Sequence, residues 1–115
     1  MYELMVESTF SAAHQLIGSK GPCEELHGHT WQVQVFLAGK KLDKIGMLLD
    51  FKDIKAGLNA VLQDYDHKFL NKSLPFNPTA ENIAREIFEA LKKGFSNINK
   101  VTVWESPNAA ASYKE

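Results

Sequence analysis

The sequence has a single cysteine, Cys23, among its 115 residues, so no disulfide can form within the chain. Its charges nearly balance, with 13 lysines and arginines against 14 aspartates and glutamates and a net charge of −1. This balance argues against general binding to nucleic acid or to a membrane surface, since both favour a basic excess. No apolar run approaches the roughly 20 residues of a membrane span, and the N-terminus lacks a basic segment followed by an apolar one. We therefore expect a cytoplasmic protein with no nucleic-acid or membrane partner.

What the sequence does contain is typical of one small globular domain. Apolar residues make up 44% of the chain and charged residues 23%, which is an ordinary balance for a soluble protein. The length is sufficient for one hydrophobic core, and no internal repeat, low-complexity segment or linker divides the chain. We expect a single domain over residues 1–115.

The spacing of apolar residues predicts the secondary structure. Alternation of apolar and polar residues is typical of strands, and apolar residues at helical spacing are typical of helices. The expected elements are strands over 2–14, 27–37, 100–105 and 109–113 and helices over 51–65 and 80–91. Asp50 and Thr79 are the expected N-caps of the two helices, and residues 71–78 are expected to form a loop. The order ββααββ predicts an α+β fold, with an antiparallel four-stranded sheet and two helices on one face.

Three histidines fall in the apolar phase of the first two strands. His27 and His29 are two residues apart, so on a strand they point to the same face. His14 shares the phase of the apolar residues of the first strand, which we expect to pair with the second. Burial of polar side chains is costly unless they have partners, and a metal held about 2.0–2.1 Å from each ring nitrogen would satisfy all three. The alternative is that these histidines only make structural hydrogen bonds in the core.

Cys23 leaves the type of metal site open. As a fourth ligand beside the three histidines, its thiolate would close a structural zinc site. If the thiol is not a ligand, three imidazoles leave an open coordination position, as in catalytic zinc sites, and the nearby cation lowers the pKa of Cys23. The thiolate could then act as a base or a nucleophile.

Two further positions carry side chains with candidate chemistry. Asp66 and His67 are adjacent at the end of the first helix, where they form either a surface pair or, if they reach a thiol, a proton relay. Glu105 shares the apolar phase of the third strand with Val101 and Val103. It either lies at the exposed end of that strand or needs paired donors, such as the adjacent N–H groups of a flat heterocycle.

Six short motifs, taken in their order and spacing, indicate a known family. They are Phe10-Ser-Ala-Ala-His14, Cys23-Glu-Glu-Leu-His-Gly-His29, Leu49-Asp-Phe51, Asp66-His67 with Leu70-Asn71, Asn77-Pro-Thr-Ala-Glu81 and Trp104-Glu-Ser106. Over nearly the whole chain the sequence resembles the zinc-dependent 6-pyruvoyl-tetrahydropterin synthases and their bacterial and archaeal relatives, the 6-carboxy-tetrahydropterin synthases (QueD). The resemblance implies the tunnelling fold, in which ββααββ subunits join their sheets into a barrel and assemble as a homo-hexamer of two trimers.

The resemblance also implies roles for the candidate residues. It implies that Zn²⁺ is bound by the three histidines of the first two strands, His14, His27 and His29. Cys23 would be the catalytic thiolate, with Asp66 and His67 in the relay. Glu105 would bind the amino and ring N–H edge of a pterin, with Thr79 nearby. In this family the active site lies at a subunit interface, so some of these residues should meet only across chains.

The implied substrate is 7,8-dihydroneopterin triphosphate, from which family members make three products. Loss of triphosphate with internal redox gives the 6-pyruvoyl product, and cleavage with release of acetaldehyde gives the 6-carboxy product of the queuosine pathway. A third subset makes 6-hydroxymethyl-dihydropterin for folate with a glutamate in the loop of the cysteine. Here Glu24 follows Cys23 directly, and it is either that catalytic carboxylate or an exposed loop acid.

The short chain favours the 6-carboxy-5,6,7,8-tetrahydropterin synthases among these enzymes. The 6-pyruvoyl and 6-hydroxymethyl products remain the alternatives within the family. A non-catalytic pterin-binding module is the alternative from another class, in which zinc is structural and Cys23 is its fourth ligand.

Overall fold

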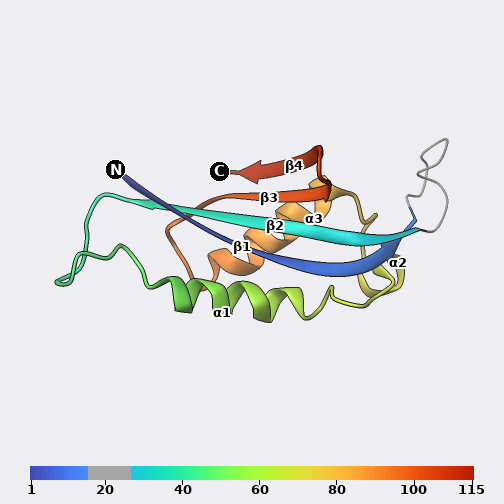
Figure 1. Cartoon of the computed structure of the whole chain (residues 1–115), viewed down its shortest axis with the longest axis horizontal. Helices are drawn as coiled ribbons and strands as arrows, with labels where there is room; N and C mark the ends of the chain where they lie inside the picture. Colours follow the sequence, from blue (N-terminus) through green and yellow to red (C-terminus); the bar gives the residue numbers. More distant parts are fainter. Residues whose placement is uncertain (16–26) are drawn as a thin grey trace.

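The structure is a computed structural model that describes residues 1–15 and 27–115, without the side chain of His27. Its elements are β1 (Tyr2–His14), β2 (His27–Gly39), α1 (Phe51–Leu62), α2 (Leu70–Ser73), α3 (Ala80–Lys92), β3 (Ile98–Ser106) and β4 (Ala109–Lys114). The strands form one antiparallel sheet in the order β1-β2-β3-β4. α1 packs against β1, and α3 packs against β3 and β4 (Figure 1). The predicted α+β fold is confirmed, and the short helix α2 corrects the expected loop over residues 71–73.

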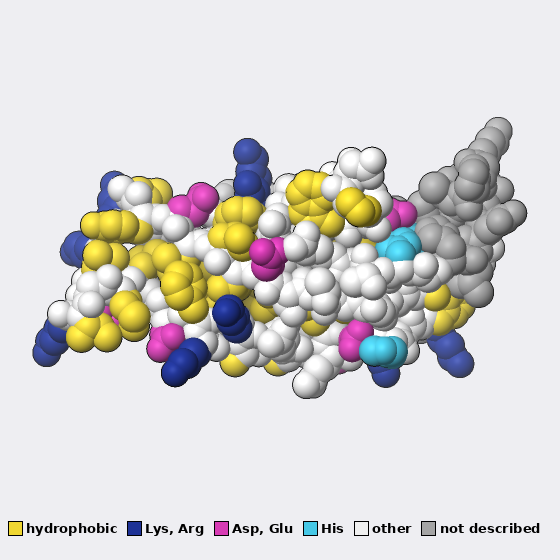
Figure 2. Space-filling model, in the orientation of Figure 1, with side chains coloured by type: hydrophobic (Ala, Val, Ile, Leu, Met, Phe, Trp, Pro, Cys, Tyr) yellow, Lys and Arg dark blue, Asp and Glu magenta, His cyan; other side chains and the backbone are white. Residues whose placement is uncertain are grey.

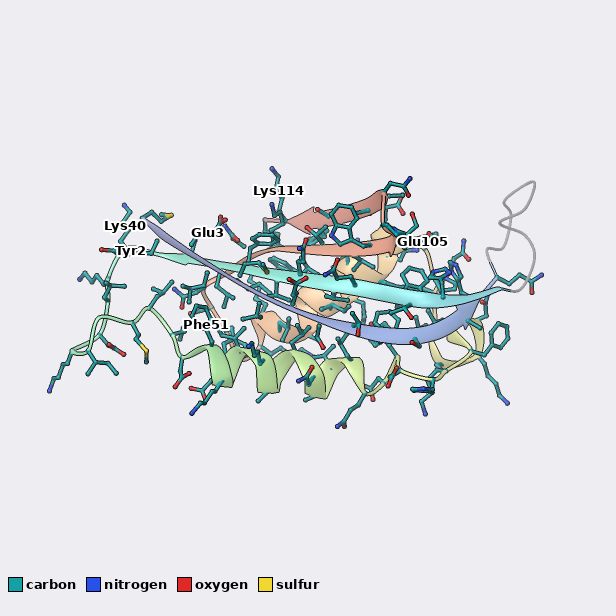
Figure 3. The ribbon with its side chains drawn as sticks, in the orientation of Figure 1. Tyr2, Glu3, Lys40, Phe51, Glu105 and Lys114 are labelled. Carbon is teal, nitrogen blue, oxygen red and sulfur yellow. The ribbon has the colours of Figure 1, made fainter. Side chains whose placement is uncertain are left out.

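The apolar residues at helical and strand spacing form the core between the sheet and the helices. The apolar residues that recur at helical spacing along α3 form a buried stripe of Ala80, Ile83, Ala84, Ile87, Phe88 and Leu91. In α1 the stripe holds for Ile54, Leu58 and Leu62. The helical spacing also predicts a buried Phe51, which is wrong: its side chain is 50% exposed, because α1 begins there, at the rim of the core (Figure 3). No helix in the described ranges is long and apolar enough to cross a membrane.

The register of β1 against β2 brings the histidines to one end of the sheet. His14 lies opposite His27, and Phe10 lies opposite Trp31. Directly opposed residues of an antiparallel pair share a face, so the phase that buries Phe10 and Trp31 also carries His14 and His29. The rings of Phe10 and Trp31 stack with centroids 5.7 Å apart, so an apolar layer lies directly beside the histidines.

The chain after α1 returns along the outer edge of β1 near the same end. The amide of His67 donates to the carbonyl of Ser11 at 2.6 Å, and the amide of Ala13 donates to the carbonyl of Lys68 at 3.0 Å. His67 has a φ of 58°, in the left-handed region that is uncommon outside glycine. These contacts fix the segment to the strand that ends in the first of the histidines.

Candidate metal and pterin site

His14 is held at the end of β1 by a hydrogen bond that selects its tautomer. The side chain is fully buried, and its Nδ1 lies 2.9 Å from the carbonyl oxygen of Pro78. A carbonyl oxygen can only accept, so Nδ1 of the neutral ring carries the proton and Nε2 presents a lone pair. Metal-binding histidines are commonly oriented in this way, by a carbonyl or carboxylate on the second ring nitrogen. The contact with Pro78 therefore prepares Nε2 of His14 to bind a cation.

Side chains from three strands converge on this nitrogen. One ligand atom each of His14, His29 and Glu105 lies within 4.8 Å of the other two. Nε2 of His14 is 3.6 Å from Oε1 of Glu105, and the rings of His14 and His29 meet edge to face with centroids 5.1 Å apart. Ligands bound about 2.0–2.2 Å from a tetrahedral zinc lie about 3.3–3.6 Å apart. The separation of His14 and Glu105 therefore fits two ligands of one zinc.

Trp31 supports both imidazoles from inside the core. Its ring centroid lies 4.7 Å from that of His14 and 4.4 Å from that of His29, and its side chain is fully buried. An apolar wall lowers the local dielectric and so strengthens the interaction of a cation with its ligands. Trp31 follows His29 by two residues, and this strand phase indicates a core residue without any sign of the second role.

Two residues of the family motifs, whose roles were not predicted from the sequence, hold the end of β1 in place. Pro78 accepts the hydrogen bond from His14 across 64 residues of sequence. Asn71, at the start of α2, accepts from the amide of Gln15 at 2.7 Å and donates to its carbonyl at 2.5 Å. The position of Pro78 directly before the N-cap of a helix was visible in the sequence, but its long-range partner was not.

Glu105 enters the cluster from an irregularity near the end of β3. Trp104 pairs with Ala110 and Ser106 pairs with Ala109, so Glu105 is one extra residue on the β3 side of the ladder. Bulges of this kind bend a strand and redirect a side chain, and they are common beside functional sites. The bulge explains how a residue of β3 comes within reach of a histidine on β1, two strands away.

A cavity of about 610 Å³ adjoins the cluster. It is lined by His29, Thr30, Glu105, Ser106, Pro107 and Ala109. Glu105 is 30% exposed, and Figure 3 shows it at the opposite end of the sheet from Tyr2. Cavities of a few hundred Å³ are of the size that binds small molecules, so Glu105 stands between a candidate metal position and space for a ligand. Of the two alternatives for Glu105, a carboxylate facing a cleft fits this position.

Asp66 and His67 form a pair that lies apart from the cluster. Nδ1 of His67 is 3.0 Å from Oδ2 of Asp66, and the His67 side chain is 82% exposed. The amide of Ser11 donates to Oδ1 of Asp66 at 2.9 Å, and this bond, aided by His67, holds the pKa of the Asp66 carboxyl below its usual range. The pair therefore belongs to the outer edge of β1. Figure 2 shows histidine surface in two separate places, each beside acidic surface.

Thr79 caps α3, as the sequence predicted. Its Oγ1 accepts a hydrogen bond from the amide of Asn82 at 3.1 Å. The capping contact uses the oxygen as an acceptor and leaves the hydroxyl proton available for a second partner. Because Thr79 follows Pro78, the start of α3 is tied to the orientation of His14.

Several predicted site residues fall outside the described part of the structure. Cys23 and Glu24 lie between residues 15 and 27, and only the backbone of His27 is described, opposite His14. The roles of these residues stay predictions.

Comparison with known proteins identifies the family. The sequence profile of the 6-pyruvoyl tetrahydropterin synthases matches residues 3–115. The chain belongs to the 6-pyruvoyl tetrahydropterin synthase family. This confirms the resemblance found in the motifs, and it makes the chain a member of a family of pterin synthases.

Relatives within this family carry more than one activity. A 6-carboxy-5,6,7,8-tetrahydropterin synthase of Haemophilus influenzae is 35% identical over 141 residues, covering 100% of both chains. A dihydroneopterin monophosphate aldolase of Pyrococcus furiosus is 35% identical over 105 residues, covering 89% of this chain and 88% of its own. The structure of Caenorhabditis elegans 6-pyruvoyl tetrahydropterin synthase matches with a TM-score of 0.90 and 32% identity, over 99% of this chain and 95% of that one. The tunnelling fold of the family is therefore confirmed.

The donor set of this family member suits a divalent metal. Imidazole nitrogens and a carboxylate oxygen are ligands that zinc accepts, and the separation of 3.6 Å between His14 and Glu105 fits two such ligands. The hydrogen bond from His14 to Pro78 supplies the orienting contact expected behind such a ligand. The described residues thus fit a zinc site at this end of the sheet.

Proposed function

We propose that this chain is a zinc-dependent lyase that converts 7,8-dihydroneopterin triphosphate into 6-carboxy-5,6,7,8-tetrahydropterin, a step of queuosine synthesis. The observation that carries the proposal is the convergence of His14, His29 and Glu105 beside a cavity of about 610 Å³. The choice among the pterin products is supported by the Haemophilus influenzae relative, which carries this name and is matched over the full length of both chains.

In the proposed reaction the zinc site binds the side chain of the substrate, and Glu105 binds its pterin ring. His14, His27 and His29 hold the zinc, and Pro78 keeps Nε2 of His14 directed toward it. Bound zinc supplies Lewis acidity to the side-chain hydroxyls of the pterin. Glu105 accepts two parallel hydrogen bonds from the amino group and ring N–H of the pterin, which fixes the plane of the ring.

Cys23, His67 and Asp66 move protons on the substrate side chain. Cys23 acts as the thiolate base, and His67 is its partner in the proton relay. Thr79 lies near the pterin ring in this proposal. The carboxylate of Asp66 is charged at neutral pH, and its contact with Nδ1 of His67 orients that ring and stabilises the imidazolium when His67 accepts a proton.

The exposure of this pair at the outer edge of β1 supports a site shared between subunits. His67 is 82% exposed at the outer edge of β1, where a second chain can approach it. We propose a homo-hexamer of two trimers in which His67 and Asp66 of one subunit serve the cluster of another.

Mass spectrometry of the reaction products tests the proposed function. Zinc-loaded protein incubated with 7,8-dihydroneopterin triphosphate is expected to consume one water and to form the 6-carboxy product, acetaldehyde and triphosphate. Cys23→Ala should abolish turnover while zinc remains bound, because the thiol is not a ligand in this proposal. Absence of turnover by wild-type protein that holds one zinc per chain would overturn the assignment.

Formation of 6-hydroxymethyl-dihydropterin is the second candidate function. Glu24 directly follows Cys23, and the Pyrococcus furiosus relative is named as an aldolase that acts on a dihydroneopterin. If the hydroxymethyl product forms and Glu24→Gln removes it, the folate-type reaction replaces the 6-carboxy one. The 6-pyruvoyl product would instead indicate elimination of triphosphate without cleavage of the side chain.

A non-catalytic zinc module predicts a different result for the cysteine variant. If Cys23 is the fourth ligand of a structural zinc, Cys23→Ala must lower zinc affinity and thermal stability together. Measurement of zinc content and melting temperature in this one variant separates the module from the enzyme.

A further inference from the structure

We infer that Glu105 alternates between two partners, the metal in the substrate-free protein and the pterin ring in the substrate complex. The inference rests on the proposed function, because it uses the same metal position and the same class of substrate. When the pterin ring binds Glu105, the metal loses this ligand, and the substrate side chain then occupies the vacated coordination position.

The contact between His14 and Glu105 has the geometry of two ligands of one cation. Because Nδ1–H of His14 donates to Pro78, the neutral ring directs the lone pair of Nε2 at Oε1 of Glu105, 3.6 Å away. A lone pair and a carboxylate oxygen that face each other attract when a metal ion lies between them, as they do when the ring carries a proton on Nε2. The separation of 3.6 Å corresponds to two ligands of one tetrahedral zinc, for which bonds of about 2.0–2.2 Å give about 3.3–3.6 Å. Glu105 is thus placed as a metal ligand as well as a pterin ligand.

Glu105 cannot serve both partners fully at the same time. A carboxylate that accepts two parallel hydrogen bonds from a pterin uses both of its oxygens. The His14 side chain is 0% exposed and fixed by Pro78, whereas Glu105 is 30% exposed and lines the cavity. Glu105 is therefore the partner that moves, by rotation about its side-chain bonds from the cluster into the cavity.

Sharing one carboxylate couples the binding of zinc and pterin, and the coupling is reciprocal. A dihydropterin that has no side chain takes Glu105 from the metal and supplies no ligand in return. It must therefore weaken zinc binding, and zinc must weaken its binding by the same factor. The hydroxyls of 7,8-dihydroneopterin can replace the carboxylate on the metal, so this compound must show a smaller effect.

Zinc affinity of two matched variants tests the metal role of Glu105. Glu105→Gln keeps the shape of the side chain, and Glu81→Gln is the control, since Glu81 is exposed and lines a second cavity beside Glu105. In competition with a chelator, Glu105→Gln is expected to lower zinc affinity by about 10–100-fold, and Glu81→Gln is expected to leave it unchanged. Equal affinity in wild type and Glu105→Gln overturns the inference while leaving the histidine site intact. A wild-type protein that binds no zinc through His14 overturns the proposed function as well.

The coupling can also be measured on the wild-type protein, without any variant. Calorimetric titration with 7,8-dihydropterin is expected to give about tenfold weaker binding to the zinc-loaded protein than to the metal-free protein. The same titration with 7,8-dihydroneopterin should show little or no such loss. Equal affinity for 7,8-dihydropterin with and without zinc overturns the exchange of Glu105 between the two partners.

Discussion

Replacement of His14 separates its contact with the backbone from its contact with the metal. His14→Ala leaves the buried carbonyl of Pro78 without its donor, which costs about 1–3 kcal/mol. It also opens a cavity at a side chain that is 0% exposed, and truncations of this kind cost about 2–5 kcal/mol. We expect the free energy of unfolding of the metal-free protein to fall by about 3–6 kcal/mol, since partial collapse of the cavity reduces the sum.

His14→Asn restores one of the two contacts. The side-chain amide of asparagine reaches about as far as Nδ1 of histidine, so it can donate to the carbonyl of Pro78, while no group remains at the position of Nε2. His14→Asn should therefore be more stable than His14→Ala by about 1–3 kcal/mol. Neither variant should bind zinc with wild-type affinity.

Urea unfolding in the presence of a chelator measures these differences. With a slope of about 1.5 kcal/mol per M, the unfolding midpoint of His14→Ala should fall by about 2–4 M, and that of His14→Asn should lie about 1–2 M above it. Added zinc should raise the midpoint of the wild type alone. A loss below about 1 kcal/mol in His14→Ala, or equal stability of the two variants, would refute the argument that Pro78 holds this ring.

Three further predictions concern the cap of α3, the acidic pair and the subunit interface. Thr79→Ala should lower the free energy of unfolding by about 1 kcal/mol and the melting temperature by about 4–8 °C. Thr79→Ser keeps the capping hydroxyl and should recover most of both losses. If Thr79→Ser is as unstable as Thr79→Ala, the cap is not what stabilises the start of the helix. The folded pKa of Asp66 is lowered, so its stabilising effect is complete above the ordinary carboxyl pKa of about 4 and is lost as the pH falls below it. Thermal melts from pH 7 to pH 3 should therefore show the wild type approaching Asp66→Asn in acid, with Asp64→Asn as the control; a constant difference would contradict this assignment. Mixing inactive His67→Ala and His14→Asn proteins should restore activity if the site is shared between subunits, and a mixture that exchanges subunits but stays inactive would argue against sharing.

The elements that were predicted from the sequence have strong local patterns. α3 has six apolar residues at helical spacing after a threonine cap, and all six are buried in the structure. α2 was not predicted because four residues are too few to show a helical period. Phe51 follows the helical spacing of α1 yet is exposed, because periodicity does not indicate where the core ends.

Strand phase predicted which face of the sheet carries the site residues, but it did not predict their orientations or contacts. The side to which His14 and His29 point follows from a period of two residues and an antiparallel pair. The orientation of the His14 ring depends on a carbonyl 64 residues away, which no local pattern contains. The reach of Glu105 depends on a bulge in the pairing of β3 with β4, and such a bulge becomes visible only once both strands are placed.

Anomalous diffraction at the zinc absorption edge, from crystals of the zinc-loaded protein, tests the central claim most directly. The account predicts one peak per chain, about 2.0–2.2 Å from Nε2 of His14 and from a ring nitrogen of His29. A peak elsewhere, or a zinc bound through Nδ1 of His14, would contradict the site. A zinc closed by the sulfur of Cys23 at about 2.3 Å would contradict the catalytic role of that thiol and favour a structural metal.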